Sequence, residues 1–224
     1  MKQIYFVRHG ESMANVDLNE YKDKPDHAIE LTPKGHNQAE ETGKFFARHF
    51  QKMKDDLGNM PHVRLWQSPY LRTRQTADGI LKHCGEFIAS NREDTMLVEQ
   101  QFGLFDGLTE EEQQQIYPIE YQHYCHNLKH NGKYWASFPH GESPFDVDKR
   151  TRLMQGTFAR DAEKHGIEHI IVVSHGITTR VMSMRYLHES YEYYSNERNP
   201  ANGSVRLLER ETDAWKDRGY IYIP

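Results

Sequence analysis

Short apolar runs separate longer polar stretches along this chain. Three of them are rich in β-branched and aromatic side chains, and this pattern predicts buried strands. These runs are KQIYFV at 2–7, HVRLWQ at 62–67 and HIIVVS at 169–174. Weaker signals predict three further short strands, at residues 96–98, 204–208 and 220–223.

A serine or threonine followed by proline occurs three times, at Thr32-Pro33, Ser68-Pro69 and Ser143-Pro144. The hydroxyl can accept a hydrogen bond from the first helical turn and proline fits the first helical position, so each pair predicts a helix start. The predicted helices cover residues 33–50, 69–83, 144–164 and, after the third strong strand, 176–187. Residues 109–129 are polar and irregularly helical, whereas 17–30 predict a surface loop.

Strands that alternate with helices predict an α/β fold with a mostly parallel sheet. We therefore expect a three-layer sandwich in which helices flank the central sheet, with a helical insertion at about residues 104–140. No repeat or linker-like stretch interrupts the chain, which favours a single domain over residues 1–224. Active sites of such sheets lie beyond the carboxyl ends of the parallel strands.

The composition argues against several classes of protein. With 28 basic and 33 acidic residues the net charge is −5, so the chain lacks the basic surface typical of nucleic-acid-binding proteins. The mean hydropathy of −0.88 and the lack of a long apolar segment argue against a membrane protein. The opening apolar run is too short for a signal peptide and the two cysteines show no CxxC spacing, so we expect a cytoplasmic protein.

Cationic and imidazole side chains occupy three predicted strand-to-helix junctions. The first strand ends in Arg8-His9-Gly10, the second leads into a helix with Arg72 in its first turn, and the third ends in His175-Gly176. Helix N-termini at this edge of the sheet offer free N–H groups, and a planar guanidinium can bind two phosphate oxygens. The junctions together predict a pocket for a small phosphorylated substrate.

The segments at these junctions resemble the histidine phosphatase superfamily, which includes the cofactor-dependent phosphoglycerate mutases. The resemblance rests on YFVRHGESMAN, SPYLRTRQTA and VVSHG, which occur in the family's order along nearly the whole chain. It implies a phosphoglycerate mutase-like fold with His9 as the nucleophile that becomes phosphohistidine. It also implies that Arg8, Arg72 and His175 hold the phosphoryl oxygens.

Two further positions take a role from the same resemblance. Asn15, six residues after His9, matches a family position that reaches the phosphate, and the N-terminal helix turn at Gly176 would also face it. Glu99, in LVEQQFG, matches the proton donor of the family. The resemblance implies no cofactor and, by analogy alone, a homodimer.

The chemistry of the residues supports these roles. A nucleophilic imidazole must be neutral with one nitrogen free, and its other N–H is usually fixed by a carbonyl. Nearby arginines disfavour the imidazolium ion, so they should lower the pKa of His9. Because arginines and histidines can stabilise the transferring charge, no metal is required.

Other interpretations stay open at single positions. Arg74 also lies in the first turns of its predicted helix and competes with Arg72 for the phosphate role. Glu99 could be a solvated loop acid, and Ser68 and Ser143 could be helix caps and nothing more. A cluster of histidines and one cysteine suggests a zinc site, although no second cluster completes it; its members are His123, Cys125, His126 and His130.

Within the superfamily, the sequence looks closest to the broad-range acid phosphatases of fungi. The shared pieces are Asn19–Tyr21, Ser68–Thr76, Glu99–Gly103, Phe138–Arg150 and Asn202–Val205. The mutase alternative is disfavoured, because the chain has no FTGW-like segment after the RHG loop and no arginine pair in the insertion. A third alternative is a phosphate- or partner-binding module that has lost catalysis, but every catalytic position is filled.

Overall fold

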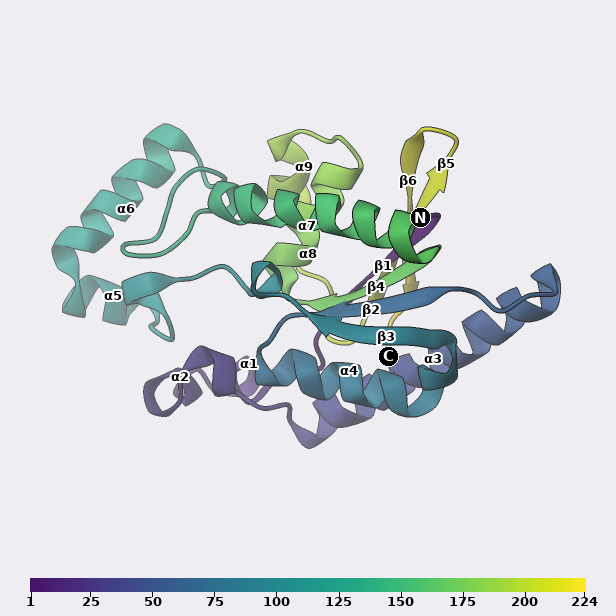
Figure 1. Cartoon of the computed structure of the whole chain (residues 1–224). Helices are drawn as coiled ribbons and strands as arrows, with labels where there is room; N and C mark the ends of the chain where they lie inside the picture. The colour runs from purple at the N-terminus through teal and green to yellow at the C-terminus, as the bar shows by residue number, and fades with distance from the viewer.

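The computed structural model describes residues 1–224, which form one six-stranded sheet with helices on both faces (Figure 1). The order across the sheet is β3-β2-β4-β1-β5-β6. The strands are β1 (Gln3–Arg8), β2 (Val63–Gln67), β3 (Ile88–Glu93), β4 (His169–Ser174), β5 (Val205–Glu211) and β6 (Ala214–Tyr222). The first four in this order pair in parallel, whereas β5 runs antiparallel to β1 and β6 to β5. The predicted mostly parallel α/β sheet is confirmed.

Nine α-helices accompany the sheet. They are α1 (Met13–Val16), α2 (Glu20–Asp23), α3 (Pro33–Leu57), α4 (Leu71–Cys84), α5 (Glu110–Ile116), α6 (Pro118–Asn131), α7 (Pro144–His165), α8 (Gly176–Tyr186) and α9 (Tyr191–Asn196). In Figure 1, α3 and α4 cover one face of the sheet, and α7 and α8 cover the other. This arrangement confirms the expected three layers.

The side chains of β1 alternate between two buried cores. Tyr5 and Val7 belong to the core that includes Phe46 and Phe50 of α3. Ile4 and Phe6 belong to the core on the opposite face, which contains apolar side chains of α7 and α8. Because both faces are covered, the strand reads as a continuous apolar run and not as an alternating one.

Two of the three predicted helix caps are confirmed. The Thr32 hydroxyl accepts a hydrogen bond from the Gly35 N–H at 3.0 Å, and the Ser143 hydroxyl accepts one from the Asp146 N–H at 3.2 Å. Helix α3 runs seven residues beyond the predicted end at residue 50 and stops before Gly58, whose φ of +71° suits glycine.

The structure corrects three other predictions. Residues 96–98 form no strand, because a 3₁₀-helix occupies Thr95–Leu97. The edge strand of this part of the chain is β3, which was not predicted because its sequence IASNRE lacks an apolar run. Ser68 does not cap α4, which begins at Leu71 with Tyr70 as the N-cap residue. The predicted loop at 17–30 contains α2 and a 3₁₀-helix, Asp26–Ala28. Helix α9 was not predicted from the sequence.

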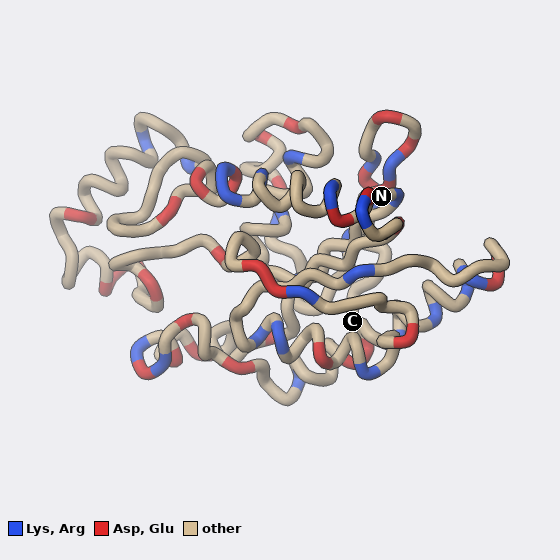
Figure 2. Tube along the Cα trace, viewed as in Figure 1, with Lys and Arg blue, Asp and Glu red and all other residues tan.

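Helices α5 and α6 lie within the expected insertion and extend from one side of the sheet in Figure 1. Aromatic packing joins this arm to the chain that returns from it: the rings of Tyr124 and Phe138 stack with centroids 4.6 Å apart, and Phe105 packs edge-on against both. Figure 2 shows acidic and basic residues interspersed along the helices. None of the helices has the length and apolar character needed to cross a membrane.

Candidate active site

The pairing of β1 with β4 brings the two candidate histidines together. Arg8 lies opposite Ser174 in the parallel register, so the next residues, His9 and His175, leave the sheet side by side. Their ring centroids are 5.3 Å apart, and both side chains are buried. The predicted convergence of these two junctions is confirmed.

One nitrogen of His9 is fixed by the backbone. Nδ1 lies 2.7 Å from the Gly10 carbonyl oxygen, which can only accept, so Nδ1 carries the proton. In the neutral ring Nε2 is then unprotonated and free to attack. Burial, followed by the charges of Arg72 and Arg8, holds the pKa of His9 well below its usual range. The ring therefore has the state that a nucleophile requires.

Gly10 allows the turn after β1 to lie against α3. A Cβ atom at Gly10 would lie 2.4 Å from the Gly35 carbonyl oxygen, much closer than any real side chain permits. The Gly10 N–H also donates to the Thr76 hydroxyl of α4 at 3.0 Å. The carbonyl that orients His9 is thus held between two helices.

Arg72 and not Arg74 reaches the site. The Arg72 guanidinium is buried, and its charge lowers the pKa of both His9 and His175. Its Nη1 donates to the backbone carbonyl and to the carboxylate of Asp26, each at 2.7 Å, so Nε and Nη2 are the groups left for a phosphate. Arg74 instead forms an exposed ion pair with Glu93.

Ser68 contacts a site histidine and does not act as the predicted helix cap. Its hydroxyl lies 2.9 Å from Nε2 of His175 and is fully buried. Burial, then the charge of Arg72, holds the pKa of His175 well below its usual range. A sequence cannot reveal this contact, because Ser68 and His175 belong to different strand ends.

Arg8 and Asn15 lie at the edge of this group. Arg8 donates to the Pro200 carbonyl at 2.6 Å, and its Nε would lie 3.7 Å from a Cβ atom at Gly176. Asn15 is exposed and accepts a hydrogen bond from the Asn202 side chain at 3.1 Å. The Asn202 side chain also donates to the His9 carbonyl at 3.1 Å. This contact was not predicted from the sequence, although the pair Asn202-Gly203 signals a turn.

Glu99 lies at the N-terminus of α8 and is not a solvated loop acid. One carboxylate oxygen accepts from the Ile177 N–H, and the other from the Thr178 N–H and hydroxyl, all at 3.2 Å. Burial lowers the pKa of Arg8, and the negative charge of Glu99 opposes this shift. The carboxyl group therefore lies at the helix end that follows His175.

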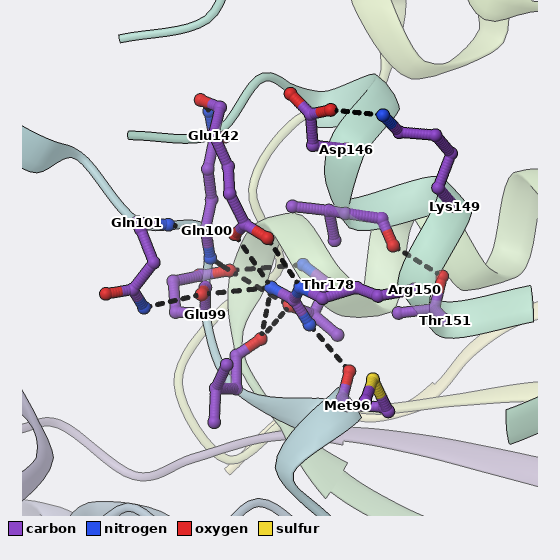
Figure 3. A network of polar contacts seen from close by, with 12 residues as sticks. Met96, Glu99, Gln100, Gln101, Glu142, Asp146, Lys149, Arg150, Thr151 and Thr178 are labelled. Atoms are coloured by element: carbon purple, nitrogen blue, oxygen red, sulfur yellow. Dashed lines mark hydrogen bonds and ion pairs between the residues drawn. The ribbon is translucent and has the colours of Figure 1, made fainter. Parts of the chain in front are cut away.

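Arg150 of α7 holds the Glu99 segment in place (Figure 3). Its guanidinium donates to the carbonyls of Met96, Val98 and Glu99 at 2.6, 2.9 and 3.0 Å. It also pairs with the Glu142 carboxylate at 2.8 Å. This irregular segment forms no backbone ladder, and side-chain donors, chiefly Arg150, bind its carbonyls instead.

The zinc alternative finds no support in the geometry. The rings of His126 and His130 are 4.2 Å apart on α6, but no group of three or more histidine, cysteine or acidic residues is arranged to hold a metal ion.

A buried neutral imidazole, a second imidazole and two guanidiniums at the strand ends describe a phosphoryl-transfer site. The sequence profile of the histidine phosphatase superfamily (branch 1) matches residues 4–220. The chain belongs to this superfamily.

Relatives and solved structures agree with this assignment. Phosphoglycerate mutase-like protein AT74H of Arabidopsis thaliana is 30% identical, over 93% of this chain and 74% of its own. Phosphoglycerate mutase-like protein AT74 of the same organism is 31% identical over 93% of this chain, but this chain spans only 65% of that protein's length. The expected resemblance to the broad-range acid phosphatases is found with DET1 of Saccharomyces cerevisiae, at 23% identity over 92% of this chain and 84% of DET1.

The fold matches solved structures along its whole length. A structure described as mycobacterial hydrolase 1 gives a TM-score of 0.74 with 19% identity, covering 100% of both chains. A mycobacterial glucosyl-3-phosphoglycerate phosphatase in complex with VO3 gives 0.72 with 20% identity, covering 97% of this chain and 98% of that one.

Proposed function

We propose that this protein is a metal-independent phosphomonoester hydrolase that acts on a small phosphorylated metabolite through a phosphohistidine at His9. The observation that carries the proposal is the state of His9: the Gly10 carbonyl fixes its proton on Nδ1, while burial and then the charge of Arg72 hold its pKa well below the usual range and keep the ring neutral. Membership of the histidine phosphatase superfamily supports the same chemistry.

In the first half-reaction, Arg8, Arg72 and His175 bind the phosphoryl oxygens, with Asn15 and the Gly176 N–H at the rim. The His9 Nε2 lone pair forms a bond to phosphorus while the ester P–O bond breaks. Glu99 gives its proton to the departing alkoxide, so the products are an alcohol and phosphohistidine. The arginines need no metal to stabilise the charge, because they are already oriented in a buried site.

In the second half-reaction, a water molecule replaces the alcohol. The Glu99 carboxylate takes one proton of this water while its oxygen bonds to phosphorus and the P–N bond to His9 breaks. The products are orthophosphate, neutral His9 and protonated Glu99, which restores the starting state.

Turnover of p-nitrophenyl phosphate in the presence of EDTA tests the proposal. We expect turnover that vanadate blocks, and we expect His9→Ala to remove both turnover and covalent labelling by phosphate. A mutase would turn this ester over slowly yet interconvert phosphoglycerates, and a binding module would do neither. Wild-type kcat in His9→Ala would disprove the nucleophile assignment.

A further inference from the structure

The segment of residues 199–204, between α9 and β5, lies against the loop that carries the nucleophile. Its Pro200 carbonyl accepts a hydrogen bond from Nη1 of Arg8 at 2.6 Å. The Gly203 nitrogen lies 3.0 Å from the Arg8 carbonyl oxygen and 3.2 Å from the His9 carbonyl oxygen. The segment therefore contacts both a candidate phosphate-binding residue and the candidate nucleophile.

Asn202 is the residue of this segment whose side chain reaches two parts of the site. Its Nδ2 lies 3.1 Å from the His9 carbonyl oxygen and 3.1 Å from Oδ1 of Asn15. A carbonyl oxygen can only accept, so the Asn202 amide must present its nitrogen on this side. The nitrogen carries two protons and each of them has an acceptor, which fixes the orientation of the Asn202 amide.

Asn15 is held by its side-chain oxygen. Oδ1 accepts from Asn202 and also from the Ser12 N–H at 3.1 Å, so donors approach this oxygen from two elements of the fold. The amide nitrogen of Asn15 therefore points away from Ser12 and Asn202, and its protons have no acceptor within the protein. Two N–H groups are left beside the nucleophile loop, and a phosphoryl oxygen is a suitable acceptor for them.

We propose that Asn202 is a positioning residue of the phosphate site. It holds the Asn15 oxygen so that the Nδ2 protons of Asn15 face the bound phosphoryl group, and the same nitrogen connects this donor to the backbone of His9. The inference rests on the proposed phosphatase function and adds to it a residue that acts on the substrate through Asn15. Without Asn202, the exposed Asn15 side chain keeps one donor on its oxygen and must be ordered by the phosphate itself, which weakens binding.

A double-mutant cycle tests this assignment, with the affinity for inorganic phosphate measured by titration calorimetry. Asn15→Ala should weaken phosphate binding about tenfold, since it removes a hydrogen bond to a charged group. Asn202→Ala should weaken it about threefold or more. In the Asn15→Ala background the same change should weaken binding by less than about 1.5-fold, because the group that Asn202 positions is gone.

Two other variants separate positioning from folding. Asn202→Leu keeps a similar shape without a donor, so it should show the same dependence on Asn15 even where alanine loosens the segment. Asn131→Ala is the matched control, because Asn131 also precedes a glycine but is exposed at the end of α6. It should bind phosphate with the wild-type affinity.

Two outcomes would overturn the inference. One is equal weakening by Asn202→Ala with and without Asn15; the other is a lower Tm in Asn202→Ala and Asn202→Leu with unchanged phosphate affinity, which indicates a purely structural role. Failure of the proposed function gives a different result, since a protein that binds phosphate but does not turn over p-nitrophenyl phosphate still completes the cycle. A wild-type protein that binds no phosphate would overturn both.

Discussion

Arg150→Met tests whether one guanidinium positions the proton donor. Arg150 donates to the carbonyl groups of Met96, Val98 and Glu99 and pairs with Glu142. Methionine fills a similar volume but donates no hydrogen bond, so the segment that carries Glu99 loses the hydrogen bonds that tie it to α7. We expect Glu99 to shift while His9, on β1, stays in place.

The size of the effect follows from the contacts. A typical hydrogen bond contributes about 1 kcal/mol, and Arg150 and Glu142 are only 15% and 22% exposed. We expect the free energy of unfolding to fall by about 2–4 kcal/mol. The solvent-exposed part of the Arg150–Glu142 ion pair contributes little to this loss. A displacement of about 1 Å lowers the rate of a reaction step that depends on exact positioning by roughly 100-fold. That loss should apply to alkyl phosphates, whose alkoxide needs a proton, and much less to p-nitrophenyl phosphate.

The assay compares kcat for p-nitrophenyl phosphate and 3-hydroxypropyl phosphate in wild type and Arg150→Met. Arg185→Met is the control, since Arg185 pairs with buried Asp148 away from Glu99 and should lower Tm without changing the ratio of the two rates. Equal slowing of both substrates by Arg150→Met would refute the positioning argument and leave a purely structural role.

Three further predictions concern single residues. Glu99→Gln should slow alkyl phosphates far more than p-nitrophenyl phosphate, and equal slowing would argue against a proton donor. His9 and His175, whose pKa values lie well below 6.5, should show no midpoint between pH 8 and pH 6 in an NMR titration. Below about pH 6.5 the unfolded chain takes up protons at these two residues, whereas the folded chain does not. The free energy of unfolding should therefore fall as the pH drops below that value. A midpoint above about pH 6 for either histidine would contradict this prediction. Gly10→Ala should abolish soluble active enzyme, since its Cβ meets the Gly35 carbonyl, whereas Gly85→Ala, with nothing within 4 Å, should behave as wild type. Normal activity in Gly10→Ala would disprove the packing argument.

The sequence predicted those elements whose local signal is strong. HIIVVS became β4 because it is apolar on both faces, and Thr32-Pro33 began a helix because the cap and the proline act within one turn. β3 was missed because an edge strand needs no apolar run, and its IASNRE sequence contains mainly polar residues. Ser68-Pro69 misled because the hydroxyl that could cap α4 contacts His175 instead.

The residues of the site likewise fall into those that the sequence predicts and those that it does not. Its histidines and Arg72 were predictable because each follows a recognisable strand end or helix start. Their partners were not, since Asp26, Asn202 and Arg150 come from segments with no local signal of contact with the site. Which acid neutralises Arg72 and which side chain supports Glu99 are decided by tertiary packing alone.

The position of β1 in the sheet has a consequence for how the protein is made. Of the six strands β1 is synthesised first, yet both of its neighbours, β4 and β5, are synthesised only after β2 and β3. Asn202 and the Gly203 N–H, which contact the His9 carbonyl, emerge from the ribosome later still than β4. His9 therefore waits without its sheet partners until β4 and β5 have been synthesised, and a nascent chain that stops before residue 202 cannot assemble the loop that holds it.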